Sequence, residues 1–339
     1  MNAIWQQFLR TTGATIGTHD GATACIGFPP ATGELLLADL SHQGVLAVRG
    51  PDAVKFLQGY LTCDVTQLSE SPVAGALCNL QGRMVTNFHA FIQGDGVLLR
   101  MHRSLVARTR ELLTKYVVFS KAKLIDESEH WQRIGVAGLD AERLVELARN
   151  AMPFSDSGSR SGSALLVLTL AASKRYELWL PINAAHRAWS ALSEVAAPIS
   201  VWRWEGLDIA EGRAWVSGTT SGQYLPQMFN LDALDAISFT KGCYLGQEIV
   251  TRAQHRGGVK RRLVRGRLEA TAGQVANIGD AVYQGDQSVG ELVAVGTTPA
   301  TEALAVVSLA SLKANTLDQP FSVGGLPFRL ANLPYSVEA

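Results

Sequence analysis

The sequence contains few cysteines, no excess charge of either sign and no long hydrophobic run. Its four cysteines are scattered without a CxxC pair, so their spacing supports neither a zinc site nor an iron-sulfur ligand set. Lysine plus arginine and aspartate plus glutamate each total 30, so any attraction to nucleic acid or anionic lipid has to be local. The longest apolar stretch, residues 164–172, falls well short of the roughly 20 residues of a membrane-spanning helix. Because residues 1–10 show no basic leader before an apolar run, we expect a cytoplasmic protein without membrane contact.

The signatures of several large enzyme classes are also missing. The chain has no GxGxxG opening a helix, no GxxxxGKS/T loop, no HExxH and no GxSxG elbow. These absences count against dinucleotide, nucleoside-triphosphate, zinc-protease and hydrolase chemistry. What is present is an ordinary globular composition, 47% hydrophobic and 18% charged over 339 residues. This composition and length predict two or three domains, each able to bury its own core.

Helical and strand-like periodicities alternate along the first 260 residues, which predicts an α+β fold. The expected helices span residues 4–9, 52–61, 104–116, 140–150 and 183–195. The expected strands span residues 34–39, 45–49, 85–92, 97–101, 134–137, 165–170 and 176–180. After Lys260, short apolar runs at residues 263–268, 281–283, 291–295 and 303–309 predict a small all-β domain. The Gly/Ser stretch at residues 155–163 predicts a surface loop.

The densest motif is FTKGCYLGQEIVTR, at residues 239–252. Its two glycines allow tight turns or close approach of a ligand, and Gln247 can start a helix. Cys243 would then lie near a helix N-terminus, with Lys241 two residues before it. Both features favour a thiolate, so Cys243 is the candidate reactive cysteine. The alternative is a small buried side chain in a structural turn.

This block, with the HRGGVKRRL that follows it, closely resembles the signature of the YgfZ-like folate-binding proteins. These proteins are a branch of the glycine-cleavage T-protein (aminomethyltransferase) superfamily. Further matches keep the family's order: DLSHQGVLAVRGPDAVKFLQGYLTCDV from residue 39, CNLQGRM from 78, KYVVFSKAK from 115, SGQYLPQ from 221 and LPYSVE near the end. Together they span about nine tenths of the chain.

The resemblance implies an α+β protein with three domains in a ring around a folate site. The first α+β domain is discontinuous and comprises residues 1–45 and 127–200. The second comprises residues 46–126 and 201–256 and carries the KGCYLGQE block. By the same resemblance, residues 257–339 are expected to form a C-terminal β-barrel, which agrees with the all-β pattern of this region.

The ligand implied by the resemblance is tetrahydrofolate or a derivative. Folate requires a carboxylate for the pterin edge, an apolar slot for the ring system and basic residues for the dicarboxylate tail. In T-proteins a glutamate two residues before a glycine holds the pterin, whereas here Glu211 directly precedes Gly212. A solvated Glu211 and a Trp204 that belongs to the core are the competing interpretations. The residues assigned to folate are Trp204, Glu211, Asn87, Gln247, Arg252 and Arg256.

One departure from the T-proteins concerns catalysis. They carry an acidic pair where this chain has Thr86 and Asn87, and an amide cannot take up a proton as a general base must. We therefore do not expect glycine-cleavage aminomethyltransferase activity, although the folate site is retained. Whether the chain is an enzyme stays open. A one-carbon transferase acting on an unknown substrate would need His42, His89 or Asp39 in place of the missing acid.

For the YgfZ-like branch, the implied function is to support assembly or repair of iron-sulfur clusters in client enzymes. These clients include radical enzymes that thiomethylate tRNA. The expected partners are reduced folate and iron-sulfur client proteins or assembly factors, with Cys243 as the functional thiol and Lys241 beside it.

A basic run at residues 252–267 raises the alternative of RNA binding. It holds seven arginines and lysines and no acid, but no aromatic residue that could stack on bases. We expect a solvated face on which Arg252 and Arg256 hold the folate tail, and no direct binding of tRNA.

Overall fold

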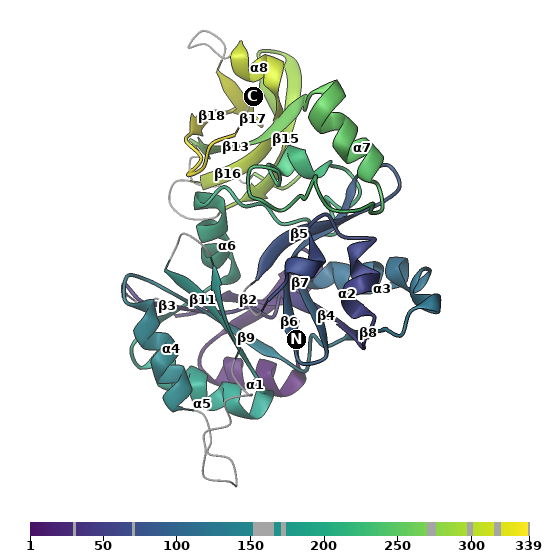
Figure 1. The fold of residues 1–339 in the computed structure, drawn as a ribbon. Coiled ribbons are helices and arrows are strands. Elements are labelled where there is room, and N and C mark those ends of the chain that lie inside the picture. Colours follow the sequence, from purple (N-terminus) through teal and green to yellow (C-terminus); the bar gives the residue numbers. More distant parts are fainter. Residues whose placement is uncertain are drawn as a thin grey trace.

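The structure is a computed structural model, and it describes residues 1–29, 32–69, 72–151, 166–170, 174–269, 276–296, 301–314 and 320–337. The stretch predicted as a surface loop, residues 155–163, lies outside the described residues. Within the described part, the strands form two five-stranded sheets, a β-hairpin and a closed barrel (Figure 1). The α+β prediction and the C-terminal barrel are thereby confirmed.

The first sheet collects strands that lie far apart in the chain. Its order is β10 (Leu166–Leu170), β11 (Arg175–Leu180), β9 (Gln132–Ala137), β3 (Leu36–Asp39) and β12 (Ala197–Ile199). Its neighbours are antiparallel except β3 and β12, which pair in parallel. In β9, Ile134 and Val136 point to one face, because side chains alternate along a strand. There they share a core with α1 (Ala3–Thr11), α4 (Ala141–Asn150) and α5 (Ile182–Ser193).

The second sheet is antiparallel throughout and local in sequence. Its order is β5 (Val73–Cys78), β6 (Met84–Gln93), β7 (Gly96–His102), β4 (Gln43–Arg49) and β8 (Lys123–Asp126). Alternation in β4 sends Leu46 and Val48 to a core with α2 (Ala53–Gln58) and α3 (Val106–Thr114). Val45 and Ala47 point the other way, into a core with two tryptophans of the first sheet's segments. The two sheets therefore meet through opposing apolar faces.

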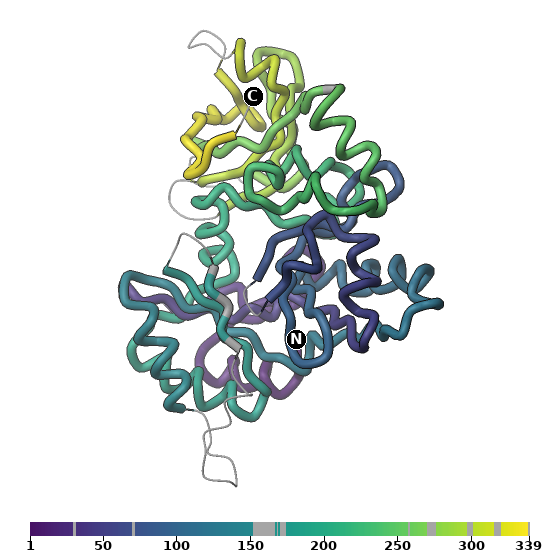
Figure 2. The backbone as a smooth tube through the Cα atoms, in the orientation of Figure 1, coloured from purple at the N-terminus to yellow at the C-terminus, as the bar shows by residue number. Residues whose placement is uncertain are grey.

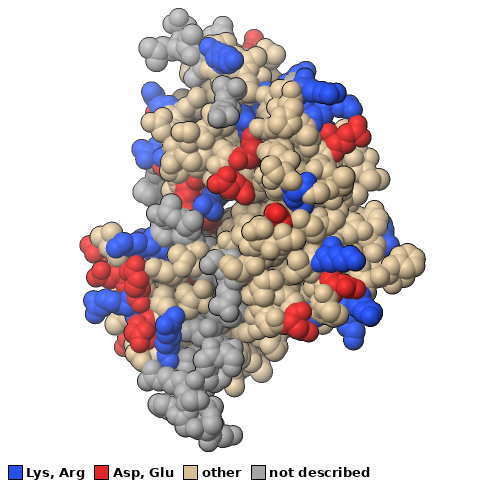
Figure 3. Space-filling model, in the orientation of Figure 1, with Lys and Arg blue, Asp and Glu red and all other residues tan. Residues whose placement is uncertain are grey.

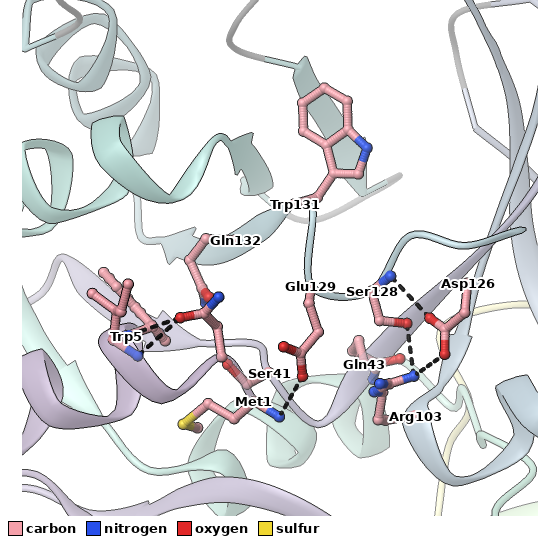
Figure 4. Close-up of polar contacts among 12 residues, drawn as sticks. Met1, Trp5, Ser41, Gln43, Arg103, Asp126, Ser128, Glu129, Trp131 and Gln132 are labelled. Carbon is pink, nitrogen blue, oxygen red and sulfur yellow. Dashed lines mark hydrogen bonds and ion pairs between the residues drawn. The ribbon is translucent and has the colours of Figure 1, made fainter.

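Polar side chains tie the N-terminus to the same junction (Figure 4). Trp5 Nε1 and Gln132 Nε2 donate to Asp39 Oδ1 at 2.8 and 3.0 Å, and Ser41 Oγ donates to it at 2.7 Å. Nearby, Arg103 donates to Asp126 at 2.7 Å. Asp39 is 1% exposed, so these bonds replace the water that its carboxylate has lost.

The barrel closes with the strand order β13, β16, β15, β14, β17, β18. Its strands are β13 (Arg261–Leu268), β14 (Ala281–Gln284), β15 (Gln287–Val295), β16 (Thr301–Ser308), β17 (Phe321–Val323) and β18 (Leu326–Ala331), and α8 (Leu309–Lys313) follows β16. The four apolar runs expected after Lys260 correspond to β13 through β16. The interior is filled by alternate side chains such as Leu292, Ala305 and Phe328.

The remaining elements join these units. The hairpin of β1 (Thr15–His19) and β2 (Ala22–Gly27) contacts α6 (Val201–Ala210). From α6 the chain runs between the second sheet and the barrel to α7 (Gln247–Arg252), as the tube in Figure 2 shows. In this connection Phe229 and Leu231 share a core with Met84 of β6 and Val306 of β16. Residues 211–246 thus join the barrel to the second sheet through a shared hydrophobic core.

Candidate functional site

Helix α6 lies between two cavities at the centre of the molecule. The larger cavity, about 790 Å³, is called the Glu211 cavity here, and the smaller, about 460 Å³, the His102 cavity. Arg213 borders both. The residues of α6 divide between the cavities, with Arg203, Leu207 and Ala210 on the first and Trp202, Glu205, Asp208 and Ile209 on the second. Figure 3 shows the surface hollowed at the centre, below the barrel, where acidic and basic side chains meet.

An ion cluster organises the Glu211 cavity. Arg175 of β11 donates from Nε and Nη2 to the two Glu211 oxygens at 3.1 and 2.8 Å, and from Nη2 to Asp208 at 2.7 Å. Arg213 Nε lies 3.5 Å from Glu211 Oε2. Burial by itself would lower the pKa of Arg175, but Asp208 and Glu211 outweigh burial and raise it. Glu211 is therefore held as an oriented carboxylate in the cavity wall, not solvated freely.

The rest of this cavity is mainly apolar with basic residues added. Its apolar walls include Leu36, Ala137, Leu207, Leu234 and the ring of Tyr335. Its cations are Lys174, Arg175, Arg203 and Arg213. Two carboxylates, Glu34 and Glu211, line this cavity together with an apolar slot and several cations. These groups, in a cavity of this size, match the three demands that a folate places on a site.

Trp204 and Asn87 do not line the Glu211 cavity. Trp204 of α6 is fully buried against β9, where a Cβ at Gly135 would lie 2.6 Å from its ring. Asn87 of β6 donates from Nδ2 to Ala214 O and accepts at Oδ1 from Val216 N, both at 2.8 Å. The Asn87 amide thus holds the segment after α6 against the second sheet. Asn87 also lines a small cavity of about 30 Å³.

The three candidates for a replacement base are all buried. Burial lowers the pKa of His42 and of His89 well below the ordinary range of histidine, and both are held neutral. Burial raises the pKa of Asp39, whose Oδ1 already accepts three hydrogen bonds. The Asp39 contacts favour a structural role for that residue. Within the described residues, neither nitrogen of His42 and not Nδ1 of His89 has a hydrogen-bond partner, so these two histidines are buried neutral side chains without a proton acceptor or donor in place at those nitrogens.

The His102 cavity holds groups that the sequence did not single out. His19 Nε2 lies 2.7 Å from Glu205 Oε2, a contact that raises the pKa of His19 against the effect of burial. His102 Nδ1 lies 2.8 Å from Ser104 Oγ, and burial lowers the pKa of His102 to about 4. Trp202 packs edge-on against His19 with ring centroids 4.1 Å apart. In the sequence, the spacing of Trp202 and Glu205 could have indicated this site, because residues three apart lie on the same side of a helix.

The block at residues 239–252 separates its two candidate functional residues, Cys243 and Lys241. Cys243 is exposed. Lys241 Nζ donates to the carbonyls of Leu61 and Cys63, both at 2.8 Å, and burial lowers its pKa to about 8. The Lys241 ammonium therefore binds backbone carbonyls of the 61–63 segment and holds the Cys243 loop against that segment. Helix α7 begins at Gln247, as expected, and continues for six residues.

The four thiols are expected to react at very different rates. Burial raises the pKa of Cys63 to about 11 and of Cys25 and Cys78 to about 12, as the apolar surroundings of Cys63 and Cys78 predicted. At pH 7 the thiolate fraction of a thiol with a pKa of 12 is about a thousandfold smaller than that of an unperturbed thiol. A maleimide or DTNB titration of the native protein should show one fast equivalent that maps to Cys243. Replacement of Cys243 by alanine should remove that phase, and a fast phase at any other cysteine would contradict the burial pattern.

Several arginines of the basic run at residues 252–267 pair with acidic residues in different parts of the structure. Arg252 pairs with Glu248 on exposed α7 at 2.7 Å, and buried Arg262 pairs with Asp232 at 2.6 Å. Arg267 pairs with Glu302 at 3.1 Å. Arg256 is exposed in the π-helical turn Ala253–Gly257 that follows α7. The two central cavities are not lined by any of the folate candidates Gln247, Arg252 and Arg256. Helices α7 and α6 lie on different sides of the barrel's base (Figure 1).

No helix in the described ranges is long and apolar enough to span a membrane. Across those same residues, no group of three or more His, Cys, Asp or Glu side chains is placed to hold a metal ion.

Comparison with known structures defines the fold. The chain superposes on the glycine cleavage system aminomethyltransferase T from Bartonella henselae with a TM-score of 0.77, at 15% identity, over 97% of this chain and 96% of the other. The molecule therefore has the glycine-cleavage T-protein fold.

Sequence comparison defines the family. The chain is 35% identical over 250 residues to the tRNA-modifying protein YgfZ of Serratia proteamaculans (strain 568), which covers 73% of this chain and 75% of the relative. It is 37% identical over 235 residues to the tRNA-modifying protein YgfZ of Yersinia pseudotuberculosis serotype IB (strain PB1/+), covering 68% and 70%. No family model matches the chain. The chain belongs to the YgfZ family, which confirms the resemblance read from the KGCYLGQE block.

Proposed function

We infer that this protein binds a reduced folate in the Glu211 cavity and, with that folate bound, supports tRNA modification. The finer part of the inference is that it maintains iron-sulfur clusters in client enzymes such as tRNA-thiomethylating radical enzymes. The observation that carries the folate assignment is the convergence of Glu211, an apolar slot and several cations in one 790 Å³ cavity. The names of the relatives support the link to tRNA modification.

Each part of the cavity has a task in holding this ligand. The Glu211 carboxylate accepts from the N–H donors of the pterin edge, and Arg175 keeps that carboxylate oriented. Leu36, Leu207 and Leu234 form the apolar slot for the ring system. A bound tetrahydrofolate supplies a carrier for one-carbon units. Lys174 and Arg203 are the cations that would receive the carboxylates of the tail.

A glycine-cleavage type of transfer is not supported. Asn87 has no titratable proton, and both ends of its amide are already bonded to backbone at 2.8 Å. We accordingly propose folate binding without turnover of an aminomethyl donor.

A titration with tetrahydrofolate, followed by tryptophan fluorescence, tests the proposal. The Glu211→Gln variant should bind roughly tenfold or more weakly, because it loses a charge-assisted hydrogen bond to the pterin. Glu248→Gln, on exposed α7, is the matched control and should bind as the unaltered protein does. With a polyglutamated folate, Arg203→Glu should weaken binding more than Arg252→Glu, since Arg203 lines the cavity.

Three results would contradict the proposal. They are absence of tetrahydrofolate binding, equal affinity of Glu211→Gln and the control, and release of formaldehyde from an aminomethyl donor at rates typical of enzymes. A larger effect at Arg252 than at Arg203 would restore the assignment of the tail to α7.

A further inference from the structure

An apolar tip projects beside the second sheet, and its side chains are largely exposed in the part of the chain that the structure describes. It is formed by the short 3₁₀ helix Val117–Phe119 after α3. Phe119 is 99% exposed and Val118 73% exposed, although both are large apolar side chains. The tip extends at the right edge of Figure 1, and the surface there is uncharged in Figure 3. Contiguous exposed apolar side chains of this kind mark interaction sites more often than ordinary surface.

A groove of about 260 Å³ runs beside the tip. It is lined by Asp52, Lys55, Phe56, Tyr60, Tyr116 and Phe119. The rings of Phe56 and Tyr60 lie 4.9 Å apart, and those of Tyr60 and Tyr116 lie 5.0 Å apart. These aromatic side chains give the groove an apolar wall that is already packed in place, so little side-chain entropy is lost when a partner binds.

Lysines lie in and next to the groove. Lys55 lines it, and Lys115 and Lys121 are each the chain neighbour of a residue that lines it. All three lysines are exposed, and the structure records no ion pair for any of them within its described residues. The lone acid of the lining, Asp52, already accepts from the Lys121 backbone N–H at 2.8 Å. An occupant that complements this site therefore carries an apolar side chain flanked by acidic residues.

The groove is joined to the loop that carries Cys243. Leu245 N donates to the carbonyl of Gly59, a groove residue, at 3.1 Å. Lys241 clamps the carbonyls of Leu61 and Cys63 just beyond it. A partner seated in the groove therefore rests on the same 59–63 segment that supports the exposed thiol.

We propose that the tip and groove are the docking surface for a client protein, which inserts an apolar side chain flanked by acidic residues and so meets the Cys243 loop. This inference rests on the proposed function and specifies the partner's contact surface. RNA fits less well, because the rings of Tyr60 and Tyr116 already pack against each other, which leaves mainly the Phe119 ring for stacking on bases.

The test compares three single variants of the full chain. Phe119→Ser removes the tip, Lys121→Glu reverses a charge beside the groove, and Val195→Ser changes a 55% exposed apolar residue after α5 as the matched control. Each is measured for binding to a purified tRNA-thiomethylating radical enzyme, to total tRNA and to tetrahydrofolate. Each is also measured for thiomethylated tRNA nucleosides in cells that lack the native protein.

We expect Phe119→Ser and Lys121→Glu to weaken client binding about tenfold or more, as for an aromatic anchor, and to lower thiomethylation. Folate affinity should stay unchanged in both, and Val195→Ser should match the unaltered protein. Client binding that is absent, or that is equal in Phe119→Ser and the control, overturns the docking surface. Loss of tRNA binding with intact client binding overturns it in favour of an RNA site. Failure of the unaltered protein to bind folate contradicts the proposed function but leaves the client result to stand separately.

Discussion

Replacement of Arg100 by methionine is expected to lower the free energy of unfolding by about 3–5 kcal/mol. Arg100 of β7 is 1% exposed and donates to Glu177 of β11, which has no exposed surface. Its guanidinium also lies over the ring of Trp215, 4.3 Å from the centroid. Without Arg100, Glu177 would remain buried, and among the described residues Trp179, at 3.3 Å, is the hydrogen-bond donor left to it. Urea unfolding of the two proteins gives the difference directly.

The double variant Arg100→Met with Glu177→Gln is the decisive control. It removes the stranded charge, so it should recover a large part of the loss. Arg267→Met removes an ion pair with Glu302 in which Arg267 is 60% exposed, and a far smaller change is expected. A double variant no more stable than Arg100→Met would show that the pair acts through packing and not through charge.

Gly246→Ala is expected to destabilise the protein by about 2–4 kcal/mol, whereas Gly242→Ala should be close to neutral. Gly246 has φ of +81°, and a Cβ there would collide with the Asn79 carbonyl oxygen. A Cβ at Gly242 would meet no atom within 4 Å. Two glycines of the same motif thus differ in function, and only Gly246 requires the absence of a side chain.

Thermal unfolding of both variants, together with the alkylation rate of Cys243, measures this difference. Gly246→Ala should alter the Cys243 rate as well, since Gly246 seats the loop against residues 79–82. Equal stability of the two alanine variants would refute the role assigned to this contact.

Much of the fold could be predicted because burial follows simple periodicity. In β4, alternate residues enter two cores, and in α4 the buried residues Leu144, Val145 and Ala148 recur at helical spacing. All five expected helices and seven expected strands are present. Several elements escaped prediction. Among them, β12 and β17 have only three residues each, and α6 buries Asp208 beside Trp204 because Arg175 neutralises it.

The site was harder to predict because its contacts come from distant segments. Glu211 was identified from its place before Gly212, but its partner Arg175 lies on another element. Of the two tryptophans in the Trp-x-Trp pattern, Trp202 faces a cavity and Trp204 the core. Residues two apart on a helix point about 200° away from each other, and with cavities on both flanks the sequence cannot tell which is buried. The basic run looked unpaired because the acids that divide it, among them Asp232 and Glu302, lie outside it.

The interleaved strands of the first sheet impose an order on biosynthesis. The second sheet needs nothing beyond Asp126, so it can form as soon as that part of the chain has left the ribosome. Strand β3 has no partner until β9 is made, and its other edge stays open until Ile199 arrives to pair with Ala38. An early strand with open edges can pair wrongly. The second sheet avoids this because its strands are close together in the sequence. The parallel β3–β12 pairing can therefore form only when synthesis has reached Ile199, directly before α6 begins at Val201.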